Sequence, residues 1–129
     1  MKTESTVYIL SKQFALRIIK LYKFLTEEKH EYIMSKQIYR SGTSIGANFA
    51  ESKFASSRAD YINKMRIALK EANETLYWLE LLRESDYIKS KEFDSLSNDL
   101  KTIIGTTVNI INKVKENNKI IITQIESKE

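Results

Sequence analysis

The sequence predicts an all-α protein that folds as an antiparallel up-down-up-down four-helix bundle. Apolar residues recur in steps of three and four along most of the chain, which is the spacing of one buried helix face. Proline is absent and glycine occurs only three times, so few residues break helices or make hairpin turns. The expected joints are only a few residues long, and short joints make consecutive helices antiparallel neighbours. We therefore expect a single domain over residues 1–129.

The first helix is expected at about residues 5–29, with Ser5 as its N-cap. The second is expected at about residues 32–53, and its centre is rich in serine, threonine, glycine and alanine. Small residues let a backbone approach its neighbour closely, although glycine in a helix costs up to about 1 kcal/mol relative to alanine. The apolar stripes of these helices are Leu10, Phe14, Ile18, Leu21 and Leu25, then Met34, Ile38, Ile45 and Phe49.

The third helix is expected at about residues 57–84. Ser56 or Ser57 can cap it, and Asp60 lies in the first turn, where a negative charge is favourable. Its apolar stripe is Tyr61, Met65, Ala68, Ala72, Leu76 and Leu79.

The fourth helix is expected at about residues 90–117, where Ser90 opens a segment similar to a capping box. The tail, residues 118–129, either extends this helix or forms a loosely held arm. The apolar seam of the helix follows a heptad pattern through Phe93, Leu96, Leu100, Ile103, Thr107, Ile110 and Val114.

A second apolar set on the fourth helix widens its face beyond what one core needs. We expect part of this surface to contact another subunit; the alternative is that the set fills a wide groove within the core. The residues are Ile104, Val108 and Ile111.

The composition excludes several classes of protein. Cysteine is absent, so neither a disulfide framework nor a thiolate metal site is present. The polar start of the chain and the polar residues that interrupt the first apolar stretch argue against a signal peptide and a spanning helix. We therefore expect a cytoplasmic protein with no membrane partner.

No pattern in the sequence carries catalysis. The only histidine, His30, follows Glu27 at the Glu-x-x-His spacing of di-iron bundles, but those sites need two such pairs. With one histidine and no cysteine, the chain also shows no complete serine or cysteine catalytic triad. The sequence contains no glycine-rich phosphate-binding loop. Some helical ribonucleases carry an arginine four to six residues before a histidine. The chain lacks this signature, because the positions before His30 hold Phe24, Leu25 and Thr26. We expect no enzyme activity, no metal and no cofactor.

Positive charge is concentrated in the middle of the chain. Residues 35–70 contain seven basic and two acidic residues, which gives 7 − 2 = +5, while the whole chain has a net charge of +4. Such a patch can bind RNA or DNA through phosphate contacts with little sequence preference. An ordinary solvated surface is the alternative. The expected nucleic-acid-binding residues are Lys36, Arg40, Arg58, Lys64, Arg66 and Lys70.

The second helix also has a polar stripe, formed by Gln37, Arg40, Ser44, Asn48 and Glu51. Arg40 and Glu51 are three turns apart, so they cannot pair with each other on one helix. We expect them to pair with another helix or another subunit. The alternative is that the stripe is the solvated side of an amphipathic helix.

The same residues resemble a known family. The run SKQIYRSGTSIGANFAE over residues 35–51, followed by Asp60, Tyr61 and IALKEANETL over residues 67–76, resembles the four-helix bundle proteins encoded in intervening sequences of bacterial 23S ribosomal RNA genes. Tyr39 stands where the family usually has the first of two arginines, and Ser52 replaces a glycine.

The resemblance implies that Arg40, Asn48 and Glu51 occupy the family's signature positions, and it carries over no catalytic residue. Related bundles include the accessory proteins of diversity-generating retroelements, which implies a homo-oligomeric ring, preferably of five subunits, with a basic surface for RNA and a partner protein such as a reverse transcriptase. Two hypotheses follow. The protein is either an oligomeric nucleic-acid-binding bundle or a protein-interaction or scaffold module without a nucleic-acid role.

Overall fold

The computed structural model describes residues 2–128, and the side chains of residues 6–117 and 119–127. The described residues form four helices joined by short connections and contain no strand, which confirms the predicted fold class at the level of a bundle of four helices. The helices are α1 (Lys2–Glu27), α2 (Met34–Ser52), α3 (Arg58–Glu84) and α4 (Ser90–Lys128).

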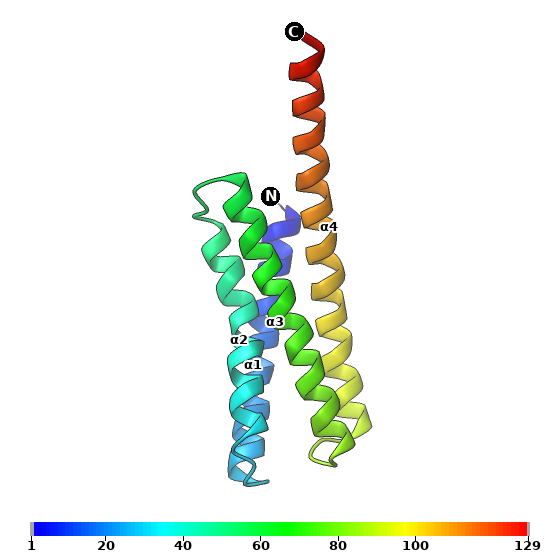
Figure 1. Cartoon of the computed structure of the whole chain (residues 1–129). Helices are drawn as coiled ribbons and strands as arrows, with labels where there is room; N and C mark the ends of the chain where they lie inside the picture. Colours follow the sequence, from blue (N-terminus) through cyan, green and yellow to red (C-terminus); the bar gives the residue numbers. More distant parts are fainter. Residues whose placement is uncertain (1, 129) are drawn as a thin grey trace.

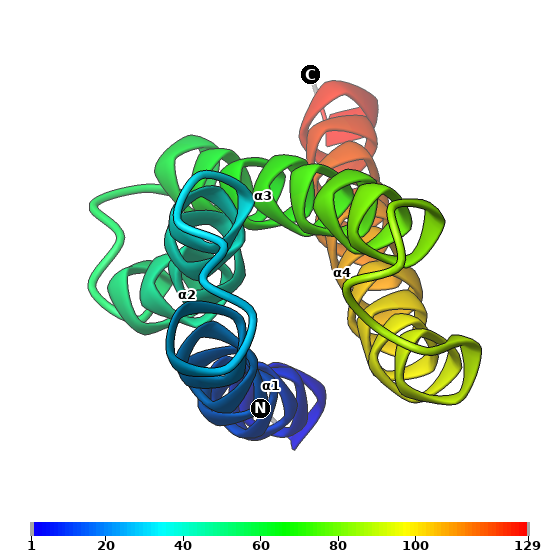
Figure 2. The same ribbon diagram turned by 90° about the horizontal axis from the view of Figure 1, so that it is seen from below.

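The helices lie side by side in chain order (Figure 1). The chain turns back at each connection, so α2 packs between α1 and α3, and α3 packs between α2 and α4. Contacts between α1 and α4 complete the bundle, although these two helices lie well apart at the end seen in Figure 2. The C-terminal part of α4 projects beyond the other three helices (Figure 1).

The first helix begins earlier than expected. Ser5 lies within α1, which starts at Lys2, and the Ser5 side chain that was expected to cap the helix lies outside the described side chains. His30 ends the turn after α1 in the left-handed region, with φ 54°. The Glu31 N–H donates to the Leu25 carbonyl at 2.9 Å, and this backbone bond closes the turn. The apolar stripe is as predicted: Phe14, Ile18, Leu21 and Leu25 are buried, and Leu10 packs partly buried against them.

The start of α2 depends on Glu31, a residue that sequence reasoning missed. Its carboxylate accepts hydrogen bonds from the backbone N–H groups of Ile33, Met34 and Ser35, at 3.1, 3.1 and 2.7 Å. Burial opposes ionisation of this carboxyl, but these hydrogen bonds prevail and lower the pKa of Glu31 below its ordinary value. The carboxylate therefore caps α2 from outside the helix, and α2 begins at Met34, two residues later than expected.

The centre of α2 approaches α1 closely. A Cβ added at Gly42 would lie 2.8 Å from Cγ1 of Ile18, and one added at Gly46 would lie 3.2 Å from Oγ of Ser11. Toward α3, the buried hydroxyls of Ser41 and Thr75 hydrogen bond at 2.9 Å. The small residues of α2 thus permit close packing of the helix against both neighbours, as predicted.

The third helix has a reciprocal cap at its start. Ser57 Oγ accepts a hydrogen bond from the Asp60 N–H at 3.0 Å, and the Asp60 carboxylate accepts one from the Ser56 N–H at 3.0 Å. This arrangement satisfies N–H groups that the first turn of a helix leaves free. At the other end, Asp86 takes the left-handed region with φ 67°, and the chain turns into α4.

The fourth helix supplies a long buried seam and then leaves the bundle. The tail extends the helix to Lys128, which answers the question that the sequence left open. None of the helices in the described part of the chain combines the length and apolar character that a membrane crossing requires. The buried seam contains Leu96, Leu100, Ile103, Thr107 and Ile110, whereas the isoleucines of the tail are exposed.

Candidate nucleic-acid interface

The outer side of α3 carries a stripe of polar and basic residues. Arg66 and Lys70 are one helical turn apart and exposed. Asn63 precedes them and Asn73 and Tyr77 follow, in steps of three and four that place all five exposed side chains on one face. We call these five residues the α3 stripe. Cations bind phosphate oxygens, and amide and phenol groups hydrogen bond to phosphates and sugars, so the stripe offers suitable contacts for a nucleic-acid backbone.

Lys64 lies on another side of α3, facing α2. Its Nζ is 3.0 Å from Oε2 of Glu51, and the two side chains are 27% and 61% exposed. The carboxylate therefore offsets part of the charge that Lys64 would offer to a phosphate. Glu51 pairs with a neighbouring helix, as expected, rather than with Arg40.

The other polar residues of α2 bond to their own helix. Ser44 Oγ donates to the Arg40 carbonyl at 2.6 Å, and Asn48 Nδ2 donates to the Ser44 carbonyl at 2.8 Å. Within the described residues, no ion pair joins Arg40 to a carboxylate, and its side chain is exposed. The side chains of Ser44 and Asn48 thus do not converge on a common point within one chain.

The six cations expected to bind nucleic acid do not form one cluster. Lys36 and Arg40 are an exposed pair one turn apart on α2, and Arg66 and Lys70 are a second such pair on α3. Arg58 is exposed at the start of α3. The structure therefore brings the expected residues together in pairs.

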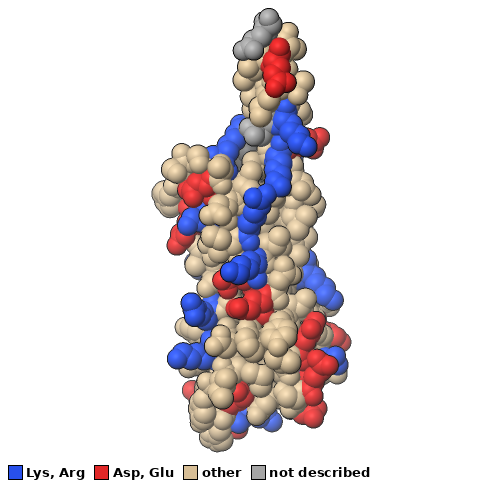
Figure 3. Space-filling model, in the orientation of Figure 1, with Lys and Arg blue, Asp and Glu red and all other residues tan. Residues whose placement is uncertain are grey.

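A further basic region lies on α4, outside the expected set. Lys113, Lys115 and Lys119 are exposed, with Glu116 among them. Figure 3 shows lysine and arginine side chains in a band that runs from the middle of α3 up to the projecting part of α4. The close spacing of these three lysines in the sequence could have indicated a basic region on the fourth helix. That α4 packs beside α3 is known only from the fold.

The second apolar set of α4 is divided between core and surface. Ile111 is buried, Ile104 is half-buried and packs against the core, and Val108 is 37% exposed. Ile111 therefore already has a place in the core of a single chain, and Val108 is the residue of the set that remains available to another molecule.

The described residues contain no group of three or more histidine, cysteine or acidic side chains placed to hold a metal ion. His30 lies at the end of the bundle, where its Nδ1 is 3.0 Å from the Tyr32 hydroxyl and its side chain is exposed.

Comparisons with known proteins agree with this architecture. The model of the family described as 23S rRNA-intervening sequence protein matches residues 3–109, which is most of the chain. A crystal structure of a protein of unknown function from the S23 ribosomal protein family of Bacteroides thetaiotaomicron VPI-5482 is 54% identical; the match covers 85% of this chain and 98% of that chain, with a TM-score of 0.84. A search among curated proteins gives no match. The chain therefore belongs to the 23S rRNA-intervening sequence protein family.

Proposed function

We propose that the protein is a non-catalytic, homo-oligomeric helical bundle that binds structured nucleic acid through a basic surface. The observation that carries the proposal is the exposed basic band over α3 and α4 in Figure 3. We assign to this band the exposed Arg66–Lys70 pair of the α3 stripe and the three exposed lysines of α4 described above.

The chemistry of the band favours backbone contacts over base recognition. Its cations are exposed on helices, and the asparagines and Tyr77 of the α3 stripe add hydrogen-bonding groups on either side of Arg66 and Lys70. Such contacts position a nucleic-acid backbone but read no base sequence directly. The expected binding is therefore tolerant of sequence and sensitive to salt.

A titration of a fluorescent RNA hairpin with the protein tests this proposal. Replacing Arg66 and Lys70 together by alanine should weaken binding at least about tenfold, because each lost phosphate contact removes counterion release. The matched control replaces Lys12 and Lys23 of α1, which are also exposed, and should bind much like the wild type. Equal losses in the two double variants would mean that only net charge matters and that the band is not the site.

The oligomeric part of the proposal draws on the apolar surface of α4. Val108 is exposed beside the core, and farther along Ile121 and Ile125 are 41% and 55% exposed on the projecting part of the helix. Ile121 lies seven residues after Val114, so it keeps one apolar position of the heptad seam past the end of the bundle, whereas the seam positions on either side of it are Asn117 and Gln124. An exposed seam of this type is suited to pairing with another helix.

Light scattering coupled to gel filtration tests assembly. We expect a multiple of the 15.1 kDa chain, with a ring of five preferred. Val108→Glu should shift the protein toward smaller species without unfolding it, because Val108 is partly exposed, whereas the corresponding change at the buried Ile111 should unfold the chain. A wild-type protein that is monomeric at micromolar concentration would remove the oligomer from the proposal.

A second candidate function is a protein-interaction or scaffold module, with a partner such as a reverse transcriptase. It is favoured by apolar side chains at the two connections that flank α2, where Ile33 is 77% and Phe54 is 88% exposed. Replacing both by serine should leave RNA binding intact. If the wild type binds no RNA, this candidate takes precedence.

A further inference from the structure

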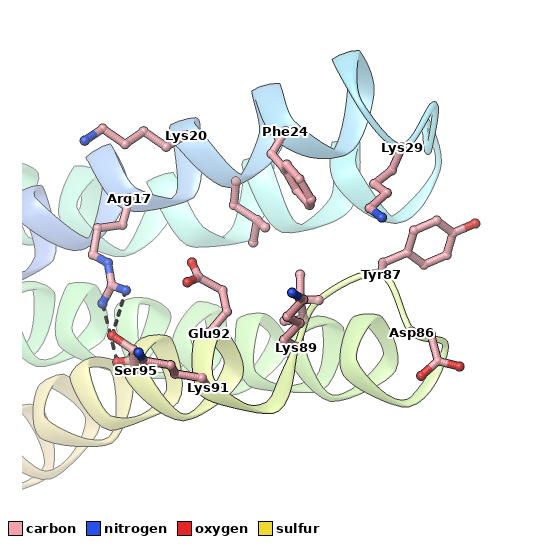
Figure 4. Close-up of a pocket in the computed structure, with 12 residues that line it drawn as sticks. Arg17, Lys20, Phe24, Lys29, Asp86, Tyr87, Lys89, Lys91, Glu92 and Ser95 are labelled. Carbon is pink, nitrogen blue, oxygen red and sulfur yellow. Dashed lines mark hydrogen bonds between the residues drawn. The ribbon is translucent and has the colours of Figure 1, made fainter.

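A groove separates the second half of α1 from the connection between α3 and α4. Its volume is about 720 Å³, and it is lined by residues from α1, from the two connections that follow α1 and α3, and from the first turns of α4. Figure 4 shows this groove from the side, with α1 above and α4 below. Binding sites for small ligands typically measure about 300–1,000 Å³, so the groove is large enough for a ligand the size of a nucleotide.

The wall of the groove offers an aromatic face over an apolar floor. Phe24 of α1 is 41% exposed, and its side chain extends into the space between the two helices in Figure 4. Leu21 and Ile88 also line the groove and are buried. A half-exposed phenyl ring on a helix is a surface on which a nucleobase stacks favourably, whatever its sequence.

The rim of the groove is basic. Lys20, Lys29, Lys89 and Lys91 are exposed lining residues, against the two carboxylates of Asp86 and Glu92. Lys29 Nζ lies 5.7 Å from the centre of the Phe24 ring, so a cation stands beside the aromatic face.

One end of the groove is bordered by an ion pair between α1 and α4. Arg17 Nη1 lies 2.7 Å from the Asp99 carboxylate, and Arg17 Nη2 donates to Ser95 Oγ at 2.8 Å. Arg17 is thereby occupied, and the lysines are the cations that remain to meet a ligand. These contacts of Arg17 also hold α1 and α4 together at this end of the groove.

We propose that this groove binds a nucleotide. The base stacks on Phe24, and the phosphate is bound by Lys29 and Lys89, whose amino groups face the groove in Figure 4. Glu92 also faces the groove and accepts a hydrogen bond from a ring N–H or a ribose hydroxyl. An aromatic face, a pair of cations and one acceptor match a nucleoside phosphate, whereas a purely apolar ligand would leave the lysines without a partner.

This site goes beyond the proposed function because it uses none of the residues of the basic band. It binds one nucleotide unit, either free or within a single strand, whereas the band contacts the backbone of a structured nucleic acid. The Arg66→Ala/Lys70→Ala variant should therefore retain nucleotide binding, and failure of either proposal is recognised separately.

Saturation-transfer difference NMR with the full chain tests the site, using AMP and adenosine as observed probes and inorganic phosphate as a competitor of AMP. AMP should bind at least about tenfold more tightly than either adenosine or phosphate, because only AMP satisfies both the ring and the lysines. Saturation should be strongest on the adenine protons, which lie nearest Phe24.

Two variants and their controls identify the residues. Phe24→Ala and Lys29→Ala/Lys89→Ala should each weaken AMP binding about tenfold or more. The controls are Leu16→Ala, an exposed apolar residue of α1 outside the groove, and Lys12→Ala/Lys23→Ala, which should bind AMP like the wild type.

A short oligoadenylate distinguishes the source of the nucleotide. Tighter binding of the oligonucleotide than of AMP, with the same loss in Phe24→Ala, supports the groove and assigns it to single strands. Equal binding of AMP and phosphate overturns the proposal, as does binding that both groove variants leave unchanged. Absence of binding by both AMP and oligoadenylate at millimolar concentration overturns it as well.

Discussion

Substitution of Gly42 by alanine tests the close packing of α1 against α2. The new Cβ would lie 2.8 Å from Cγ1 and 3.0 Å from Cγ2 of Ile18. Both atoms branch from the Cβ of a buried side chain, so they have little freedom to move away. Overpacking of this kind costs about 1–3 kcal/mol. Replacing glycine by alanine in a helix recovers about 1 kcal/mol, so the expected net loss is up to about 2 kcal/mol.

Gly105→Ala is the matched control, because the added Cβ on the exposed side of α4 meets no atom within 4 Å apart from its chain neighbours and the backbone of its own helix. This variant should gain up to about 1 kcal/mol from helix propensity alone. Urea unfolding followed by circular dichroism at one protein concentration measures both variants. In an Ile18→Ala background the cost of Gly42→Ala should disappear. If Gly42→Ala is as stable as Gly105→Ala, the close contact has been misplaced.

Two further predictions concern the turn between α1 and α2. Glu31→Gln should destabilise the protein by about 1–2 kcal/mol, because the hydrogen bonds to the α2 N-terminus weaken. Folding lowers the pKa of Glu31 from 4.5, so the ionised carboxylate stabilises the folded protein fully above pH 4.5. This stabilisation is lost as the pH falls through the lower pKa of the folded state. The free energy of unfolding of Glu31→Gln, measured in acid, should therefore lack this pH-dependent decrease. His30→Gly should raise the unfolding free energy by about 1 kcal/mol, because glycine adopts the left-handed conformation without strain; a decrease would mean that the hydrogen bond to Tyr32 outweighs the strain.

The helices were predictable where a local spacing of residues along the chain is enough to define them. The seam from Leu96 to Ile110 repeats without interruption, and Ser57 is a good N-cap placed three residues before Asp60. The Glu31 cap was not predicted, because its carboxylate reaches three successive N–H groups from outside the helix and has no standard spacing. Ile33, in turn, is the formal N-cap residue but makes no side-chain bond.

The candidate sites were only partly predictable, because they depend on which helices become neighbours. The sequence placed Arg66 and Lys70 among six expected cations, but it grouped them with Lys64, which the fold turns toward Glu51. The lysines of α4 are more than 40 residues from Arg66 and Lys70 in the chain, so charge counting in one window missed them. The groove has the same origin, since Phe24 and Lys89 meet only in the folded chain.

The salt dependence of RNA-hairpin binding tests the central claim most directly. The logarithm of the wild-type association constant should fall steeply and linearly with the logarithm of salt concentration, with a slope that counts phosphate contacts. The Arg66→Ala/Lys70→Ala variant should have a slope shallower by up to about two units, one for each lost contact, while Lys12→Ala/Lys23→Ala keeps the wild-type slope. Absence of binding at about 50 mM salt, or one common slope for all three proteins, would contradict the assignment of a nucleic-acid interface to the basic band.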